Sequence, residues 1–175
     1  NRKRVLSQST TAAATLSAVI VGAVPVPIPD ATILGPVEIA AITAISKIYG
    51  IDKEHGAERF KETIAEVGTV SLAAKGVLSL TKAIPGLNLA TSVANAVVAG
   101  SIVAALCGAT IYACEQVYLG NKSADDADWL KRLVESKLSG DFVAKVTDAL
   151  KQTASDGLDA KRIADLIFGL FSTGK

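Results

Sequence analysis

The chain has 175 residues and a formal net charge of +1, and half of its residues are hydrophobic while only 5% are aromatic. This length suits one domain of ordinary size with a real core and excludes two such domains. Acidic and basic residues nearly balance, so no summed field attracts nucleic acid, and we expect no nucleic-acid partner. The apolar mass comes from small and aliphatic side chains, which favours closely packed helices.

The first predicted elements are two apolar arms on either side of a proline-rich corner. Val5–Val24 carries no charge, and Ala31–Gly50 contains only Glu38 and Lys47. Each proline fixes its own φ and pushes the preceding residue out of the helical region, so neither arm continues through the corner as helix. We predict an α-hairpin with a rigid corner. The corner residues are Pro25, Pro27, Pro29 and Asp30, where Asp30 caps the following helix turn or, alternatively, is a buried acid that switches or pairs with a base.

Two further helices are expected before the middle of the chain. Gly35-Pro36 predicts the start of the helix in the second arm, with Glu38 in its first turn and Tyr49-Gly50 at its end. Ala57–Lys82 has acidic residues on one face and apolar residues on another, which predicts an amphipathic helix. That helix is expected to border both water and an apolar layer.

Small residues recur every fourth position in both long apolar segments. Ala83–Cys114 carries no charge over 32 residues, more than the roughly 20 that cross a bilayer as helix. Residues four apart lie on one helix face, and small side chains let another helix approach closely. We predict that these two small-residue stripes mark the closest helix packing. The first stripe contains Ala14, Ala18 and Gly22, and the second contains Ser92, Ala96, Gly100, Ala104 and Gly108.

The long apolar helix is expected to end at Tyr118-Leu119, before the stop signal Gly120-Asn121, and the composition changes there. Three short amphipathic helices are predicted after it, starting near Ser123, near Ser139 and within Ser155–Asp159, each with an apolar stripe. They form either a small bundle or a cover over the apolar part. The sequence therefore predicts an all-α helical bundle, divided into a hydrophobic helical domain (1–120) and an amphipathic C-terminal subdomain (121–175).

A set of motifs in the apolar part occurs together in a known family. They are Pro25, Pro27, Asp30, Pro36, Ile42, Ile45, Tyr49-Gly50, Lys82–Gly86, Gly108 and Tyr112–Glu115. On these motifs, residues 16–119 resemble the helical domain that many bacterial proteins carry behind a Ras-like GTPase domain, domain-of-unknown-function family 697. One departure is Glu38, where the family is expected to have Gln. The resemblance implies a membrane-associated helical module operated by a GTPase.

No catalytic constellation is found. A phosphate-binding loop needs G-x-x-x-x-G-K-[ST], and no complete run of this kind occurs. His55 is the only histidine, so neither a histidine pair for zinc nor a His-activated nucleophile is expected. Cys107 and Cys114 are expected to be buried free thiols. We predict a non-catalytic protein without a cofactor or a metal.

Three functions fit the apolar segments. Basic residues at the open ends of the hairpin, Arg2–Arg4 on one arm and Lys47 and Lys53 after the other, agree with the positive-inside preference. We therefore expect a membrane-associated module that faces the cytoplasm, with lipid and a GTPase domain or another helical protein as partners. A soluble helical interaction or regulatory domain, with a second copy of the chain among its candidate partners, is the alternative. A channel-forming domain ranks third.

Overall fold

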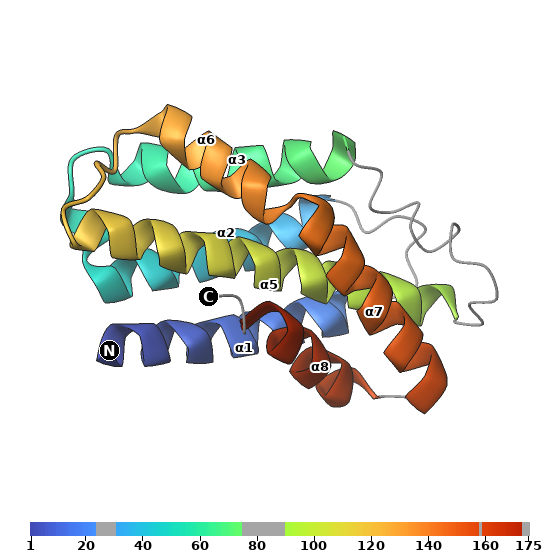
Figure 1. Cartoon of the computed structure of the whole chain (residues 1–175). Coiled ribbons are helices and arrows are strands. Elements are labelled where there is room, and N and C mark those ends of the chain that lie inside the picture. The colour runs from blue at the N-terminus through green and yellow to red at the C-terminus, as the bar shows by residue number, and fades with distance from the viewer. Residues whose placement is uncertain (24–30, 75–89, 158, 173–175) are drawn as a thin grey trace.

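A computed structural model describes residues 1–23, 31–74, 90–157 and 159–172, without the side chains of 31–34, 70–74 and 91. These residues form helices and no strand, which confirms the all-α fold class. In chain order the helices are α1 (Arg2–Gly22), α2 (Ala31–Tyr49), the short 3₁₀ helix η1 (Ile51–Lys53), α3 (Ala57–Ala74), α5 (Thr91–Tyr118), α6 (Ala127–Lys137), α7 (Gly140–Asp156) and α8 (Ala160–Ser172) (Figure 1).

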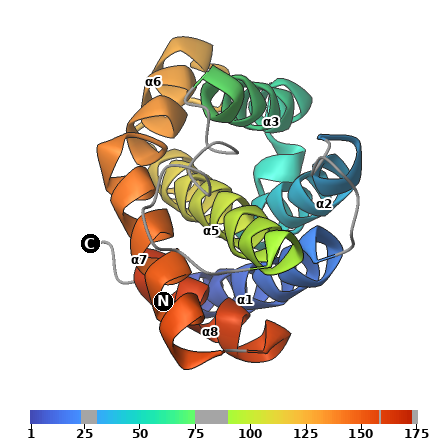
Figure 2. The same cartoon turned by 90° about the vertical axis from the view of Figure 1, so that its right-hand side faces the viewer.

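Helix α5 is the centre of the bundle. Figure 2 looks nearly along it and shows the other helices arranged around it. From its start to Cys114 the helix carries no charged residue on any face, and side chains such as Val97, Val103 and Ala113 are buried. No face of the helix therefore favours water over most of its length. Accordingly, 83% of the residues in its most apolar stretch are buried.

Helices α1 and α2 pack side by side in opposite directions. The Nζ atom of Lys3, at the start of α1, donates a hydrogen bond to the carbonyl oxygen of Ile48, at the end of α2, over 3.1 Å. The two apolar arms therefore fold against each other, as the α-hairpin interpretation requires. The predicted corner residues Pro25, Pro27, Pro29 and Asp30 lie outside the described residues, so the rigid corner stays a prediction.

The start of α2 differs from the sequence prediction. Helix α2 begins at Ala31, so Pro36 lies inside it and Glu38 is not in its first turn. Pro36 has no backbone N–H and so removes one internal hydrogen bond of α2, and the contacts of α2 with α1 and α5 outweigh this loss. Of the helix predicted over Ala57–Lys82, the described part ends at Ala74, whereas α5 ends at Tyr118 as expected.

The C-terminal helices cover the apolar part. The side chain of Asp126 caps α6 by accepting a hydrogen bond from the backbone N–H of Trp129, so this helix starts later than Ser123. Leu130 of α6, Phe142 of α7 and Ile167 of α8 are buried in the same hydrophobic cluster as the side chains of α1, α2 and α5. Residues 121–172 thus pack as a cover on a shared core.

Candidate functional site

The two small-residue stripes meet where α1 crosses α5. A Cβ atom placed on Gly22 would lie 2.7 Å from the Cβ of Ala99 and 3.1 Å from the Cα of Ala96. Side-chain rotation cannot relieve contacts with a Cβ and a backbone atom. The missing side chain at Gly22 therefore lets α1 lie directly against α5, and Ala18, one turn earlier, is fully buried in the same interface.

The second stripe has two different environments along α5. A Cβ atom on Gly100 would lie 2.6 Å from Cγ2 of Val19 and 2.9 Å from Cδ1 of Ile167, so α1 and α8 both press on this glycine. Ala104 is buried one turn further on, while Ser92 and, on α1, Ala14 are half-buried. A Cβ atom on Gly108 would meet no atom within 4 Å. The stripe thus stops being a close contact before Gly108.

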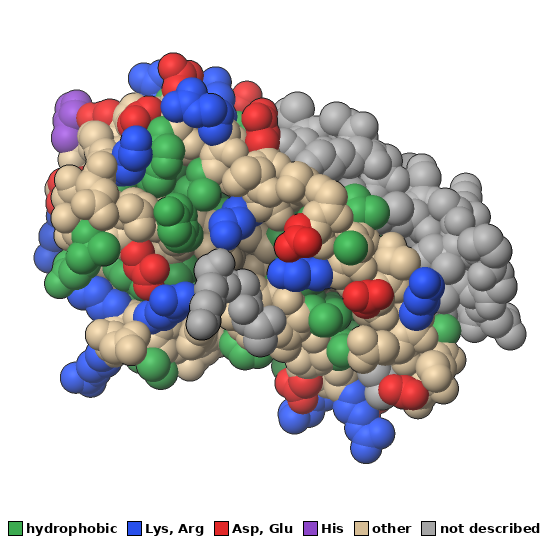
Figure 3. Space-filling view, in the orientation of Figure 1, with side chains coloured by type: hydrophobic (Ala, Val, Ile, Leu, Met, Phe, Trp, Pro, Cys, Tyr) green, Lys and Arg blue, Asp and Glu red, His purple; other side chains and the backbone are tan. Residues whose placement is uncertain are grey.

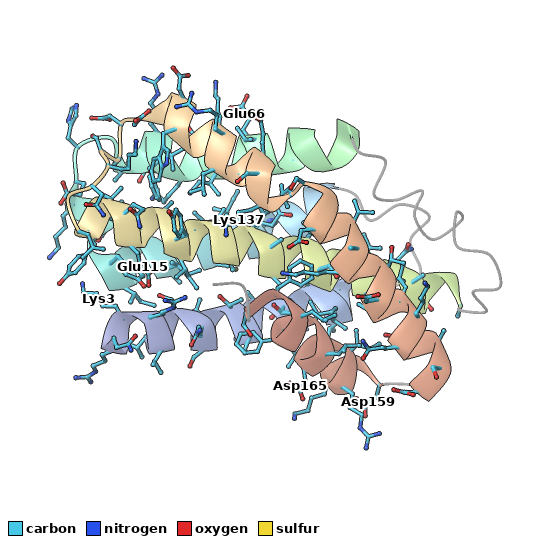
Figure 4. The ribbon with its side chains drawn as sticks, viewed as in Figure 1. Lys3, Glu66, Glu115, Lys137, Asp159 and Asp165 are labelled. Atoms are coloured by element: carbon cyan, nitrogen blue, oxygen red, sulfur yellow. The ribbon has the colours of Figure 1, made fainter. Side chains whose placement is uncertain are left out.

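A polar cluster joins three helices at the open end of the hairpin, where α1 begins and α2 ends. The hydroxyl of Tyr49 donates a hydrogen bond to Oε1 of Glu115 over 3.1 Å, and Nε of Arg4 lies 3.8 Å from the same carboxylate oxygen. Burial and the neighbouring carboxylate raise the pKa of Tyr49, so the hydroxyl remains the donor. Nζ of Lys3 lies 4.4 Å from the ring centre of Tyr118 (Figure 4 labels Lys3 and Glu115). The cluster fastens the ends of α1, α2 and α5 together.

The outward side of the hairpin is exposed and uncharged. No other described helix covers this side in Figure 2. Its exposed apolar residues include Ile20, 53% exposed, and Ile39, 55% exposed. We call this surface the hairpin outer face. It consists of Leu6, Ser9, Ala13, Ser17 and Ile20 of α1 and Pro36, Ile39 and Ala40 of α2.

The hydroxyl groups on the hairpin outer face bond to their own helix. The hydroxyl of Ser9 donates to the carbonyl oxygen of Val5 over 3.2 Å, and that of Ser17 donates to the carbonyl oxygen of Ala13 over 3.0 Å. A hydroxyl with an internal acceptor costs less to remove from water than one without a partner. The face is therefore better suited to an apolar environment than its serine content indicates.

Among the described residues of the hairpin, exposed charge lies at the open end. Glu38, within α2, is only 7% exposed and faces inward. No described Lys or Arg forms an ion pair with Glu38, and burial raises its pKa. The accessible charge at the open end is mixed, with basic residues in excess: Arg2, Arg4, Lys47 and Lys53 are exposed there together with Asp52 and Glu54.

The described residues contain neither a metal-ligand cluster nor a thiol that ionises readily. No group of three His, Cys, Asp or Glu residues among them could hold a metal ion. Burial raises the pKa of Cys107 and of Cys114 to about 12, so both thiols stay protonated near neutral pH. The pattern G-x-x-x-x-G-K of a phosphate-binding loop occurs at residues 169–175, but Gly169–Ser172 is the end of helix α8 rather than a loop after a strand.

Sequence reasoning missed the hairpin outer face and the polar cluster. The face has a signal, because Leu6, Ala13 and Ile20 recur every seven residues on the side of α1 opposite the buried Thr11, Ala18 and Gly22. The pairing of Tyr49 with Glu115 leaves no signal in the sequence, because the two residues lie in different helices and 66 positions apart.

Two described helices, α1 and the Ser92–Tyr118 part of α5, are long and apolar enough to cross a membrane. Length and composition alone also fit a core helix, and α5 is such a helix here. Comparison of the chain with models of known families, with curated proteins and with solved structures finds no match. The similarity to the GTPase-associated helical family therefore rests on the motifs quoted above.

Proposed function

We propose that this chain is a non-catalytic helical module that binds the cytoplasmic surface of a membrane through its hairpin outer face. The observation that carries the proposal is the uncharged, exposed outer side of α1 and α2 with basic residues at one end. Apolar side chains enter the headgroup region, and Lys and Arg bind anionic headgroups. The closed bundle lies on the bilayer in this arrangement and does not span it.

The expected binding energy is modest and depends on lipid charge. Leu6, Ile20 and Ile39 are each about half exposed, so their transfer contributes together about 2–4 kcal/mol. The four exposed basic residues at the open end are offset by Asp52 and Glu54, which leaves about two net charges and about 2 kcal/mol on an anionic surface. The sum, about 4–6 kcal/mol, is similar to that of one myristoyl chain, which anchors a protein reversibly. Neutral membranes should therefore bind the chain weakly.

The proposal also includes a GTPase partner. The described residues form helices and no strand, whereas a phosphate-binding loop joins a strand to a helix, so the GTPase domain would belong to another part of the parent protein or to a separate protein. The similarity of the quoted motifs to the GTPase-associated family supports this part. A parent gene without a GTPase domain, together with failure to bind any GTPase encoded beside it, would contradict this part alone.

A soluble interaction or regulatory domain is the second candidate. It is favoured by α5, because the most apolar helix of the chain is already buried and needs no lipid. In that case another helical protein, or a second copy of the chain, would cover the hairpin outer face. A channel former is the third candidate, and it would require α5 to leave the bundle.

Flotation with vesicles tests these candidates. Without detergent, we expect the protein to float with vesicles of phosphatidylcholine mixed with phosphatidylglycerol. With vesicles of phosphatidylcholine alone, we expect it to stay at the bottom of the gradient. Ala13→Glu places a charge on the hairpin outer face and should abolish flotation, whereas Ala144→Glu, at an exposed alanine of α7, is the matched control and should not.

Each other outcome has a definite meaning. A wild-type protein that stays monomeric and ignores anionic vesicles would contradict membrane binding and favour the soluble interaction domain. Equal flotation of Ala13→Glu and Ala144→Glu would show that another surface binds. Release of a dye trapped in the vesicles would favour the channel former.

A further inference from the structure

A groove lies beside α5, on the side of α1 opposite the hairpin outer face. It has a volume of about 580 Å³, within the roughly 300–1,000 Å³ typical of small-molecule sites. Its α1 wall includes Arg4 and Thr11, and the other walls come from α6, α7 and α8. Figure 3 views the molecule from this side.

The floor of the groove is apolar and has open space above one residue. Ala104, Ala105, Gly108 and Ile111 of α5 line it, and aromatic side chains of α7 and α8 line the walls. Because a Cβ atom on Gly108 would meet no atom within 4 Å, the space above this glycine is free. An extended hydrocarbon chain could lie along this floor and bury its surface there.

Two lysines on one wall have no carboxylate partner in the described part of the chain. Nζ of Lys137 lies 5.5 Å from the ring centre of Tyr112, and Nζ of Lys145 lies 5.3 Å from that of Phe171. In Figure 4 the side chain of Lys137 lies over α5. Each lysine is held by an aromatic ring and keeps its positive charge available to a ligand.

The acidic residues of the groove do not cancel this charge. Glu115 is within ion-pair distance of Arg4, which leaves Asp141 as the remaining acid beside the two lysines. The rim therefore carries a net positive charge over an apolar floor. The complementary ligand has a negative headgroup and a single hydrocarbon chain.

We propose that this groove binds a single-chain anionic amphiphile, with its acyl chain on the Gly108 floor and its carboxylate or phosphate headgroup at Lys137 and Lys145. A fatty acid and a lysophospholipid share this chemistry. The site is separate from the hairpin outer face, so the inference does not rest on membrane binding. It gives the bundle a soluble lipid ligand in addition to a surface that contacts a bilayer.

Fluorescence titration with a pyrene-labelled long-chain fatty acid, below its micelle concentration and without vesicles, tests the inference. Saturable binding is expected, with the methyl ester of the same acid binding about tenfold more weakly because it lacks the charge. Displacement by a lysophosphatidic acid, compared with displacement by an unlabelled fatty acid, shows which headgroup is preferred. Inorganic phosphate should not displace the probe, since it has no chain.

Variants of the floor and the rim separate the two parts of the site. The Cβ atom of Gly108→Leu would meet no atom within 4 Å, so we expect this variant to remain folded and to bind the acid at least tenfold more weakly, because its side chain occupies the floor. Lys137→Gln combined with Lys145→Gln should remove the preference for the acid over the ester. Lys151→Gln, at an exposed position of α7 outside the groove, is the control and should change neither.

Three results would overturn the inference. They are non-saturable binding by the wild type, equal affinity for acid and ester, and unchanged affinity in a Gly108→Leu variant that circular dichroism shows to be folded. Flotation of Gly108→Leu with anionic vesicles should equal that of the wild type, so failure here is distinct from failure of membrane binding.

Discussion

Two glycines of α5, Gly100 and Gly108, allow the closeness of helix packing to be measured with one substitution. Each Gly→Ala change in a helix interior gains about 0.8–1.0 kcal/mol of helix propensity, and this gain is shared by the two variants. At Gly108 nothing opposes it, because the new methyl group enters free space. At Gly100 the methyl group would lie 2.6 Å from Val19 and 2.9 Å from Ile167.

The difference between the variants follows from this overlap. Carbon atoms pack at about 3.5–4.0 Å, so α1 or α8 must move by about 1 Å, since Val19 and Ile167 are fully buried and cannot swing aside. Overpacking of this kind costs about 1–3 kcal/mol. Gly100→Ala should therefore be less stable than Gly108→Ala by about 1–3 kcal/mol, and its melting temperature should be about 2–12 °C lower.

Thermal and urea unfolding followed by circular dichroism measure this difference. The wild type gives the reference, and Gly108→Ala should melt above it. Equal shifts in the two variants would refute the reasoning, because they would mean that α1 and α8 do not press on Gly100 in solution.

Three further predictions concern buried polar groups. Because burial raises the pKa of Glu38, its contribution to stability is most favourable below the unfolded-chain value of 4.5 and falls as pH rises through the folded-state pKa. The unfolding free energy of Glu38→Gln should therefore exceed that of the wild type by about 1–3 kcal/mol above neutral pH. In urea titrations this difference should become smaller as the pH is lowered toward 4.5, and a difference that does not change with pH would contradict the prediction. Tyr49→Phe should cost about 1–2 kcal/mol, but much less in a Glu115→Gln background, so additive losses in the double-mutant cycle would disprove the hydrogen bond. Cys107 and Cys114 should resist maleimide labelling in the folded protein and react fully in guanidinium. Anionic vesicles should not make the labelling of the folded protein faster. Faster labelling would mean that the bundle opens on the membrane.

The fold class could be predicted from the sequence because charge and apolar spacing determine which faces a helix buries. The end of α5 at Tyr118 followed from the turn signal after it, and the apolar stripes of α6, α7 and α8 followed from their spacing. The predicted start of α2 was wrong because packing of α2 on α1 and α5 outweighs the hydrogen bond that Pro36 removes inside the helix, and the proline signal does not contain that packing.

Features that depend on the packing partner could not be predicted in the same way. Gly100 and Gly108 occupy equivalent places in the second small-residue stripe, yet only Gly100 has helices on it. The inward orientation of Glu38 depends on how α2 is placed in the bundle, and the position of the two lysines over the groove depends on how α6 and α7 are placed. The spacing of residues along a single helix gives no information on these placements. Periodicity identifies a face, whereas only the assembled bundle shows what covers it.

The position of α1 affects how the protein can be synthesised. Its buried residues rest on α5 and α8, and α8 begins only at Ala160. At roughly 5–20 residues per second, α1 leaves the ribosome roughly 7–30 s before α8 does. For that interval the side of α1 that α8 later covers stays open, and α1 carries no charge after Arg4, so a nascent chain stalled before α8 presents the kind of segment that chaperones and membranes capture first.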